Sequence, residues 1–132
     1  MAKENGLGWT TFSVDTSAGS LKAIVNDITS ASWQMPRAIQ DVTGLDKSAM
    51  ERIHLLADFS VSMSGVFNDA TDASHDVFKN LANVRTCTVV VSGQTLTNEV
   101  LLTDYPLSRS ESGELTWTVP GVLADGTVPA WA

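Results

Sequence analysis

Hydrophobic and polar residues alternate along several stretches of the chain, which is the pattern of half-buried β-strands. The clearest stretch covers residues 57–67, where Phe59, Val61 and Met63 lie on one face and serines lie on the other. The same reasoning predicts further strands over residues 9–14, 20–33, 84–91, 95–109 and 114–119. Residues 20–33 fit either one long strand or two strands joined by a bulge. Short turn sequences predict antiparallel hairpins at two places, 92–94 and 110–113.

One segment has helical spacing instead. In residues 69–84 the apolar side chains recur every three or four positions and form one stripe that can pack on a sheet: Ala73, Val77, Phe78, Leu81 and Val84. Acidic residues at the start of this segment suit the positive end of a helix dipole. A shorter helix is predicted over residues 48–53, because Ser48 and Glu51 have the spacing of a capping box.

Together these elements predict a mainly β fold, an antiparallel β-sandwich or partly closed barrel with one flanking α-helix. Residues 1–132 form a single domain in this interpretation. Its parts are an N-terminal arm with the first strand, a long inter-strand loop, the flanking helix and an extended C-terminal tail, over residues 1–20, 34–56, 69–84 and 121–132. A loop as long as 34–56 is uncommon in a compact domain and is typical of a functional segment.

The composition is that of an ordinary globular domain. The chain has 132 residues, of which 43% are hydrophobic and 17% charged, and this suffices for a hydrophobic core. No apolar run approaches the length needed to cross a bilayer, and the N-terminus lacks the apolar core of a secretion signal. The single cysteine, Cys87, lies in a predicted strand, where a buried and unreactive side chain is expected.

The charge balance narrows the possible partners. There are 15 acidic and 8 basic residues, which give a net charge of −7, and the basic residues are scattered singly. Binding to a phosphate backbone draws on clustered lysine and arginine, which release counterions when they contact it. A negative surface repels nucleic acid instead. The sequence therefore disfavours a protein that holds DNA or RNA.

Few residues of the sequence suggest a metal-binding or catalytic site. The best metal-binding candidate is a group at near-helical spacing, Asp69, Asp72, His75 and Asp76, but a dinuclear helix site needs a second such group facing it. His54, with Glu51 three residues before it, supplies half a motif. Acidic residues at a helix start have a simpler explanation in the helix dipole. The chain has no Gly-x-Ser-x-Gly elbow and no phosphate-binding loop, so the residues give little support for an enzyme.

The loops and tails contain more large apolar residues than solvated segments need. Trp131 lies next to the C-terminus in DGTVPAWA, and GLGWTTF near the N-terminus is also apolar. The segment from Trp33 to Leu56 adds Met35, Ile39, Val42, Leu45, Met50, Ile53 and Leu55. Such residues become buried either against the chain's own core or in an assembly. The residues alone leave both explanations open.

Several of these segments follow one another in an order that is known from a protein family. They are DITSASW at 27–33, DVTGLDKSAMERIHLLADFSVSMSGVF at 41–67, the helix that follows, the paired late strands and ADGTVPAW at 124–131. In this order they resemble a bacteriophage tail tube protein, closest to the short major tail proteins of tailed phages. The resemblance extends over residues 20–132, and the order and spacing of the motifs carry it rather than any single one.

This resemblance implies a structural virion protein. Six subunits would form a ring whose joined sheets line a β-barrel pore, and rings would stack into a tail tube that conducts the genome into the host cell. It implies no enzymatic activity and no cofactor. The implied partners are other copies of the chain, tail-tip or baseplate proteins, a tail-terminator protein, a tape measure protein in the lumen and, transiently, DNA. The implied location is the phage tail of the virion, assembled in the host bacterial cytoplasm.

The resemblance also assigns residues to contact surfaces. Segment 34–56 becomes an assembly loop, and the expected contacts between subunits or rings are apolar residues of this loop and of the tails: Trp9, Phe12, Trp33, Met35, Ile39, Val42, Leu45, Ile53, Val128 and Trp131. Polar residues of the late hairpin are expected to face the lumen: Thr103, Asp104, Glu114, Thr116 and Thr118. Lys22 and Arg109 are expected in salt bridges between subunits. The acidic balance suits a lumen in which DNA slides without binding.

Three other interpretations fit the sequence. The first is a different ring-forming protein with a related sandwich, such as a head–tail completion protein or the inner tube of a secretion or injection machine. The second is a monomeric β-sandwich module that binds carbohydrate or protein, which needs a concave site with exposed aromatic residues. The third is a small metal-dependent enzyme built on the group from Asp69 to Asp76.

Overall fold

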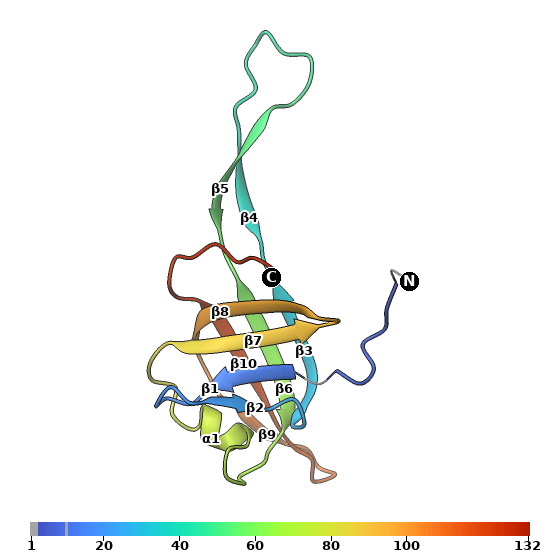
Figure 1. The fold of residues 1–132 in the computed structure, drawn as a ribbon, viewed down its shortest axis with the longest axis vertical. Helices are drawn as coiled ribbons and strands as arrows, with labels where there is room; N and C mark the ends of the chain where they lie inside the picture. The colour runs from blue at the N-terminus through green and yellow to red at the C-terminus, as the bar shows by residue number, and fades with distance from the viewer. Residues whose placement is uncertain (1–2, 10) are drawn as a thin grey trace.

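The structure is a computed structural model that describes residues 3–9 and 11–132 (Figure 1). Antiparallel strands dominate it, as the alternating pattern predicts. In chain order its elements are β1 (Thr11–Asp15), β2 (Leu21–Ala23), β3 (Ile28–Gln34), β4 (Arg37–Asp41), β5 (Arg52–Ala57), β6 (Ser60–Val66), α1 (Ser74–Phe78), β7 (Arg85–Val91), β8 (Gln94–Leu102), β9 (Leu107–Arg109) and β10 (Leu115–Leu123). The predicted mainly β fold with one helix is thus confirmed for the described residues.

All these strands except β4 and β5 belong to one sheet, in the order β2–β1–β7–β8–β10–β6–β3, with β9 paired to β10. The sheet folds over so that two layers face each other. We call β2, β1, β7 and β8 the front layer, and β10, β6, β3 and β9 the back layer; their strands cross at a steep angle (Figure 1). This is the arrangement of orthogonally packed sheets. The described strands do not close into a barrel, so the sandwich is the predicted variant that forms.

The core lies between the two layers and takes the inward-facing half of each strand. On β6, Val61 and Met63 are buried and Ser62 between them is exposed, as the alternation predicts. Val119 of β10 lies beside Met63 in the same layer, and the front layer and α1 supply further core side chains: Phe12, Val14, Val77, Phe78, Val89, Leu96 and Val100. Trp117 has the largest fully buried side chain, and its indole Nε1 donates a hydrogen bond of 2.7 Å to the Val66 carbonyl. Cys87 is buried as expected, and burial raises the pKa of its thiol to about 12, so that it is unreactive.

A tight turn and a bulge set the ends of several strands. Between β7 and β8, Ser92 and Gly93 have φ values of 51° and 79°, the left-handed backbone that tight two-residue hairpins require. Residues 20–33 form two strands, β2 and β3, rather than one. A register shift between Ile28 and Ser30 adds a bulge at the start of β3.

The helix is shorter than the pattern indicates. The apolar spacing predicts residues 69–84, whereas α1 covers only Ser74–Phe78. The fully buried guanidinium of Arg85 explains the early end, because it donates hydrogen bonds to the backbone carbonyls of Asp15, Val77, Asn80 and Ala82. In a longer helix the Val77 carbonyl would accept the amide four residues later instead. Asn83, with φ 71°, then turns the chain into β7.

Segment 34–56, expected as a loop, contains a β-hairpin. β4 and β5 form a separate two-stranded sheet in which Asp41 pairs with Arg52. The helix expected over 48–53 does not form, because part of that range closes the hairpin and begins β5. The Thr43 hydroxyl donates to the Asp41 carboxylate at 2.6 Å and accepts from the Glu51 amide at 2.7 Å, which fixes the turn. A register shift between Arg37 and Ile39 interrupts the alternation that would have revealed the hairpin in the sequence.

Candidate functional site

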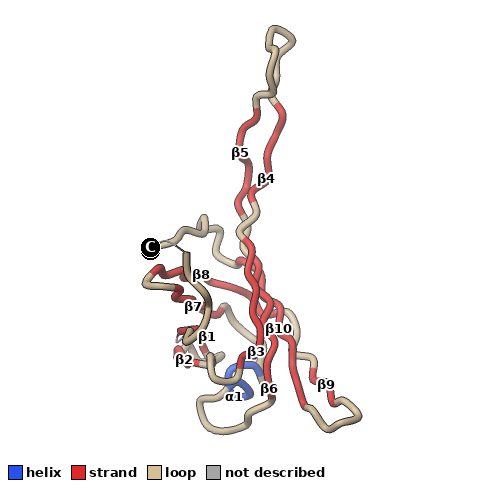
Figure 2. The backbone as a smooth tube through the Cα atoms, turned by 90° about the vertical axis from the view of Figure 1, so that its right-hand side faces the viewer, coloured by secondary structure: helices blue, strands red, loops and turns tan. Residues whose placement is uncertain are grey.

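The β4–β5 hairpin is the most prominent surface feature of the molecule. Residues 37–57, which we call the hairpin arm, project from the body along its longest axis (Figures 1 and 2). Every residue of β4 is exposed, and so is every residue of β5 except Ala57. A two-stranded ribbon on its own is at best marginally stable in water. Within the subunit, the arm therefore lacks the buried side chains that stabilise the body.

Both faces of the hairpin arm carry apolar side chains. Ile39 pairs with His54 on one face, and Ile53 pairs with Gln40 on the other. Their exposed fractions are large, 55% for Ile39 and 48% for Ile53, and Leu56 is 87% exposed. A strand ribbon that packs on one surface has one apolar face and one polar face. An arm that is apolar on both faces suits a position between two surfaces.

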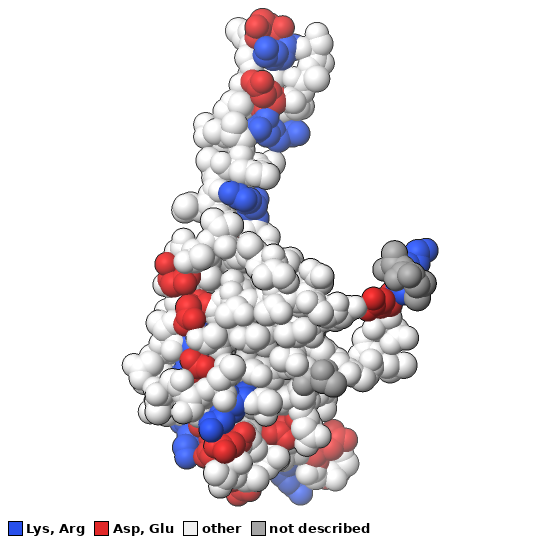
Figure 3. Space-filling model, viewed as in Figure 1, with Lys and Arg blue, Asp and Glu red and all other residues white. Residues whose placement is uncertain are grey.

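The charges of the hairpin arm are balanced. It contains Arg37, Lys47 and Arg52 against Asp41, Asp46 and Glu51, so +3 and −3 sum to zero, and the net charge of −7 belongs to the rest of the chain. Figure 3 shows acidic and basic side chains following each other along the arm. Hydrogen bonds from the Thr43 hydroxyl and amide lower the pKa of Asp41. The arm can thus approach another copy of this acidic protein without net repulsion.

Trp9 near the N-terminus and the C-terminal end of the chain pack on their own subunit, while residues 3–8 are exposed. The Trp9 ring lies 5.6 Å from both Phe12 and Trp33, and its Nε1 donates a hydrogen bond of 2.6 Å to the Val90 carbonyl. At the other end, the Trp131 ring lies 6.5 Å from Trp33. The last residue exchanges two backbone hydrogen bonds with β8. For the tails, the structure therefore favours burial against the chain's own body, one of the two explanations that the sequence left open.

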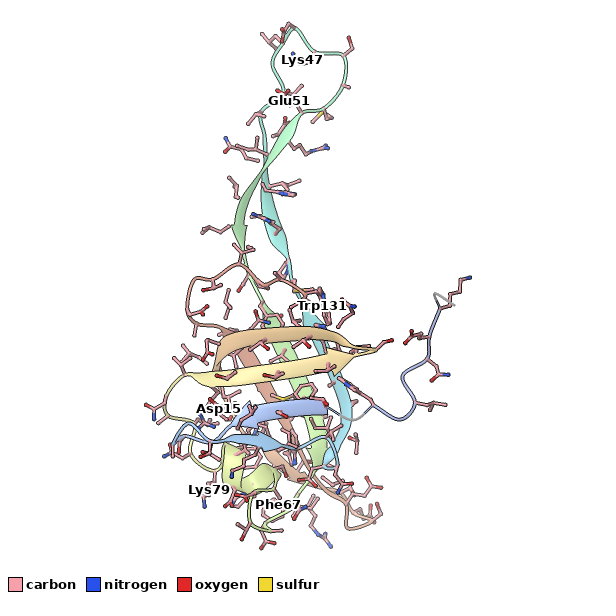
Figure 4. The ribbon with its side chains drawn as sticks, viewed as in Figure 1. Asp15, Lys47, Glu51, Phe67, Lys79 and Trp131 are labelled. Carbon is pink, nitrogen blue, oxygen red and sulfur yellow. The ribbon has the colours of Figure 1, made fainter. Side chains whose placement is uncertain are left out.

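The predicted contact residues divide into three groups. Phe12 lies in the core with none of its surface exposed, so its side chain is not available to a neighbour. Trp9 and Trp33 are half-buried at the junction of the tails. The others are exposed, either on or beside the arm or near its base: Met35, Ile39, Val42, Leu45, Ile53, Val128 and Trp131. Figure 4 shows Trp131 close to the base of the arm and Lys47 at its far end.

Two further exposed leucines belong with these residues. Leu56 lies at the arm base and Leu7 in the N-terminal arm, and both are 87% exposed. The sequence contains both residues, but nothing in the pattern distinguishes a leucine that reaches solvent from one that folds inward. Leu56 also lines a groove of about 720 Å³ between the arm base and the C-terminal tail, together with Pro36, Ala38, Leu123 and Val128.

The residues predicted to face a lumen do not share one surface. Thr116 and Thr118 lie on the outer face of β10, and Thr118 pairs with Ser64 of β6. Thr103 and Asp104 lie in the connection after β8, and Glu114 lies in the turn before β10. The sequence placed these residues on one late hairpin, whereas β10 pairs with β8, β9 and β6 along different parts of its length.

The candidate metal ligands are engaged in other interactions. The Lys22 ammonium lies 3.1 Å from the Asp72 carboxylate, so this pair forms within the subunit and not between subunits as expected for Lys22. Asp76 accepts hydrogen bonds from the Asp72 amide and the Lys79 ammonium, which lower its pKa. The His75 ring packs 4.8 Å from Phe67. Among the described residues, no group of three or more acidic, histidine or cysteine side chains is arranged to hold a metal ion.

Arg109, the other residue expected in a salt bridge, lies exposed on β9. Within the part of the chain that the structure describes, no helix is long and apolar enough to cross a membrane.

Solved structures share this fold over nearly the whole chain. No model of a known protein family matches the sequence, and neither does any curated protein. A chain from the tail of an empty gene transfer agent particle, computed with C6 symmetry, has a TM-score of 0.74 and 19% identity, over 98% of both chains. A chain from the virion of a native gene transfer agent particle also has a TM-score of 0.74, with 16% identity over 98% of this chain and 99% of the other. At this identity the comparison shows a shared fold.

Proposed function

We propose that this protein is the subunit of a phage-like tail tube, in which six copies form a ring and rings stack head to tail. The observation that carries the proposal is the hairpin arm, apolar on both faces and exposed along its length. The shared fold with a chain of a gene transfer agent tail of C6 symmetry supports the six-membered ring. In this proposal the protein is a structural virion component without catalytic activity or cofactor.

The arm is the proposed contact between successive rings. Burying a leucine or isoleucine side chain that is otherwise exposed stabilises by about 1.5–3 kcal/mol. The arm offers several such side chains in each subunit, among them Ile39, Val42, Leu45, Ile53 and Leu56, with Met35 at its base. An arm on one end of the molecule that fits a surface elsewhere on the next copy makes a head-to-tail contact, and such contacts propagate into stacks.

The tail junction is the proposed second contact. Trp9, Trp33 and Trp131 form one aromatic group, and Trp131 lies near the base of the arm (Figure 4). Trp131 is 41% exposed and Val128 is 53% exposed, so a neighbour that covered this end would bury both. Aromatic residues of this kind are enriched in the centres of protein interfaces.

The tube would conduct a genome into the host cell. The net charge of −7 lowers the affinity of its surfaces for nucleic acid, so that DNA passes without binding. The further partners in this proposal are a tail-tip or baseplate protein, a tail-terminator protein and a tape measure protein within the lumen. Assembly would take place in the cytoplasm of a bacterial host, and the tail of the virion is the final location.

Negative-stain electron microscopy of the purified protein over a concentration series, with light scattering alongside, tests the proposal. We expect hollow tubes or stacked rings above a threshold concentration. A variant in which residues 41–52 are replaced by a two-residue Asn-Gly turn is the control, since it keeps the body and the Gln40–Ile53 pair and removes the end of the arm. It should retain the circular dichroism of the body and fail to stack. A monomer that also fails to extend a purified tail-tip complex contradicts the proposal.

The arm also separates the proposal from a single-ring protein, such as a head–tail completion protein. A single ring needs lateral contacts only. An arm that leaves the body along its long axis gives each ring a second ring to contact. Isolated rings that never stack, seen under the conditions above, would favour the single-ring function.

A further inference from the structure

Residues 3–8, which we call the N-terminal segment, lie away from the body of their own subunit. Every residue of the segment is exposed, and a cleft of about 460 Å³ lies between it and the turn that joins β7 and β8. The chain meets the body at Trp9, whose ring packs on Phe12. The side chains of the segment are therefore open to contact with another molecule.

Leu7 is the one large apolar residue of the N-terminal segment. Its amide donates a hydrogen bond of 2.9 Å to the side-chain oxygen of Asn5, and the next residue, Gly8, has a φ of 70°. A glycine adopts this left-handed backbone at little cost, so the chain turns here. The Leu7 side chain nevertheless remains 87% exposed. Its burial against another surface would stabilise the contact.

The groove at the arm base, between the arm and the C-terminal tail, is a surface suited to such a side chain. Leu123 and Ala124 are half-buried there, and their amides donate hydrogen bonds of 2.9 Å to the carbonyls of Phe59 and Glu99. Val128 lines the same groove and is exposed. The groove therefore combines apolar residues that the backbone holds in place with an apolar side chain that a partner can cover.

The charges of the groove and of the segment are complementary. Arg37 lines the groove, and the carboxylate of Glu4 is exposed on the segment. Between the residues that the structure describes, neither Arg37 nor Glu4 takes part in an ion pair. Glu4 lies three residues before Leu7, which separates them by at most about 11 Å along an extended chain. Both side chains can thus reach one groove, and opposite charges favour this pairing.

The segment and the groove lie on opposite sides of one subunit. Figure 1 shows the N-terminal segment leaving the body on one side, whereas residues 124–128, which border the groove, lie on the other side. The segment therefore does not fill the groove of its own subunit. A contact between two different surfaces of identical copies is heterologous, and it closes into a ring if the rotation fits. The occupant that this geometry favours is the segment of a second copy.

We infer that the groove at the arm base is the binding site for the N-terminal segment of a second copy, with Leu7 packed against Leu123 and Val128 and with Glu4 paired to Arg37. This inference rests on the proposed function. It names the segment of the neighbour that covers Val128 in the tail-junction contact.

Disulfide crosslinking between two different variants tests the inference. One chain carries Leu7→Cys and the other carries Val128→Cys, and tubes assembled from an equal mixture are oxidised with copper phenanthroline. The native Cys87 is 1% exposed and its high thiol pKa leaves it unreactive. In the control mixture Leu21→Cys replaces Val128→Cys, because Leu21 is 52% and Val128 is 53% exposed and Leu21 lies on β2, away from the groove.

We expect the mixture of Leu7→Cys and Val128→Cys to give about tenfold or more of the disulfide-linked dimer found in the control mixture, because a disulfide requires Cα atoms within about 7 Å of each other. Tubes of either variant alone should give no more dimer than the control. A third mixture, of Leu45→Cys and Val128→Cys, asks whether the end of the hairpin arm fills the groove instead.

An exchange of charges tests the ion pair. Glu4→Arg and Arg37→Glu should each raise the concentration at which tubes form by about threefold, because each replaces an attraction between exposed charges with a repulsion. The double variant restores opposite charges, so its threshold should return to within about twofold of that of the unmodified chain. A double variant that assembles no better than the single variants would show that Glu4 does not pair with Arg37.

Two crosslinking results overturn the inference and leave the tube in place. One is a mixture of Leu7→Cys and Val128→Cys that gives no more dimer than the control, and the other is a dimer between Leu45→Cys and Val128→Cys. If the unmodified chain forms no ring or tube by electron microscopy, the proposed function fails first and the inference fails with it. The micrographs are taken before oxidation, so the two failures are distinguishable.

Discussion

The body and the hairpin arm of this protein are built from the same kind of strand but differ in what holds them. In the body, each strand buries one face between two layers, and residues such as Leu96 and Val119 are fully enclosed. In the arm, two strands pair only with each other and both faces are exposed. Strand pairing alone stabilises little without burial of a face. The difference indicates that the body is stable by itself, whereas the arm gains its burial from other copies.

The same substitution in the two regions should therefore have different effects on the free subunit. Leu96→Ala removes a fully buried side chain from the core and should lower the free energy of unfolding by about 2–5 kcal/mol. Leu56→Ala, at a side chain that is 87% exposed, should change it by about 0.5 kcal/mol or less. Urea denaturation followed by tryptophan fluorescence measures both. Equal losses in the two variants would contradict the division between body and arm.

Assembly, in contrast to the stability of the free subunit, should depend on the exposed side chains of the arm. Leu56→Ala should raise the concentration at which tubes form by about tenfold, because about 1.4 kcal/mol of lost burial corresponds to that factor. Leu21→Ala is the control, at a leucine that is 52% exposed but lies on β2 of the body. Sedimentation of assembled protein over a concentration series measures the threshold. A threshold that Leu56→Ala leaves unchanged would remove the arm base from the proposed contact between rings.

The smallest expected effect concerns the turn of the arm. The Thr43 hydroxyl, and to a smaller extent the Thr43 amide, lowers the pKa of Asp41. The stabilisation of the turn by the charged carboxylate is therefore fully present above about pH 4, the usual pKa of an aspartate. It is lost as the pH falls through the lowered pKa. Thr43→Val should raise the pKa of Asp41 towards its ordinary value. The pKa of Asp76, lowered in the body by the Asp72 amide and Lys79, should stay low in the same variant. NMR titration of the carboxyl groups measures both.

An unchanged Asp41 pKa in Thr43→Val would mean that the hydroxyl does not hold the turn in solution. A rise in the pKa of both aspartates would instead indicate that the substitution disturbs the body, and would contradict the independence of the two regions.

Local patterns predicted much of the body. The alternation around Val61 and Met63 identified β6 and the face it buries, because side chains of a strand point to opposite sides. The turn at Ser92 and Gly93 was readable because few residues tolerate a left-handed backbone. Burial of Cys87 followed from its place in an apolar strand.

Contacts between residues far apart in the sequence explain where the structure differs from the predicted elements. The helix ends early because Arg85, beyond the predicted segment, binds the carbonyls that would have continued it. Such contacts also decide which of the predicted contact residues reach the surface. Phe12 and Trp9 are aromatic residues of the same short segment, GLGWTTF, yet Phe12 is enclosed in the core and Trp9 is only half-buried.

The order of neighbouring residues was enough to predict most strands of the body, the side chains that these strands bury and the excess of apolar groups in the loop and tails. Tertiary contacts were needed to show that segment 34–56 forms an arm with two apolar faces, and that Trp9 and the C-terminal tail pack on their own subunit. Each of these depends on which distant strands pair and in which register, and a shift of one residue would exchange every face.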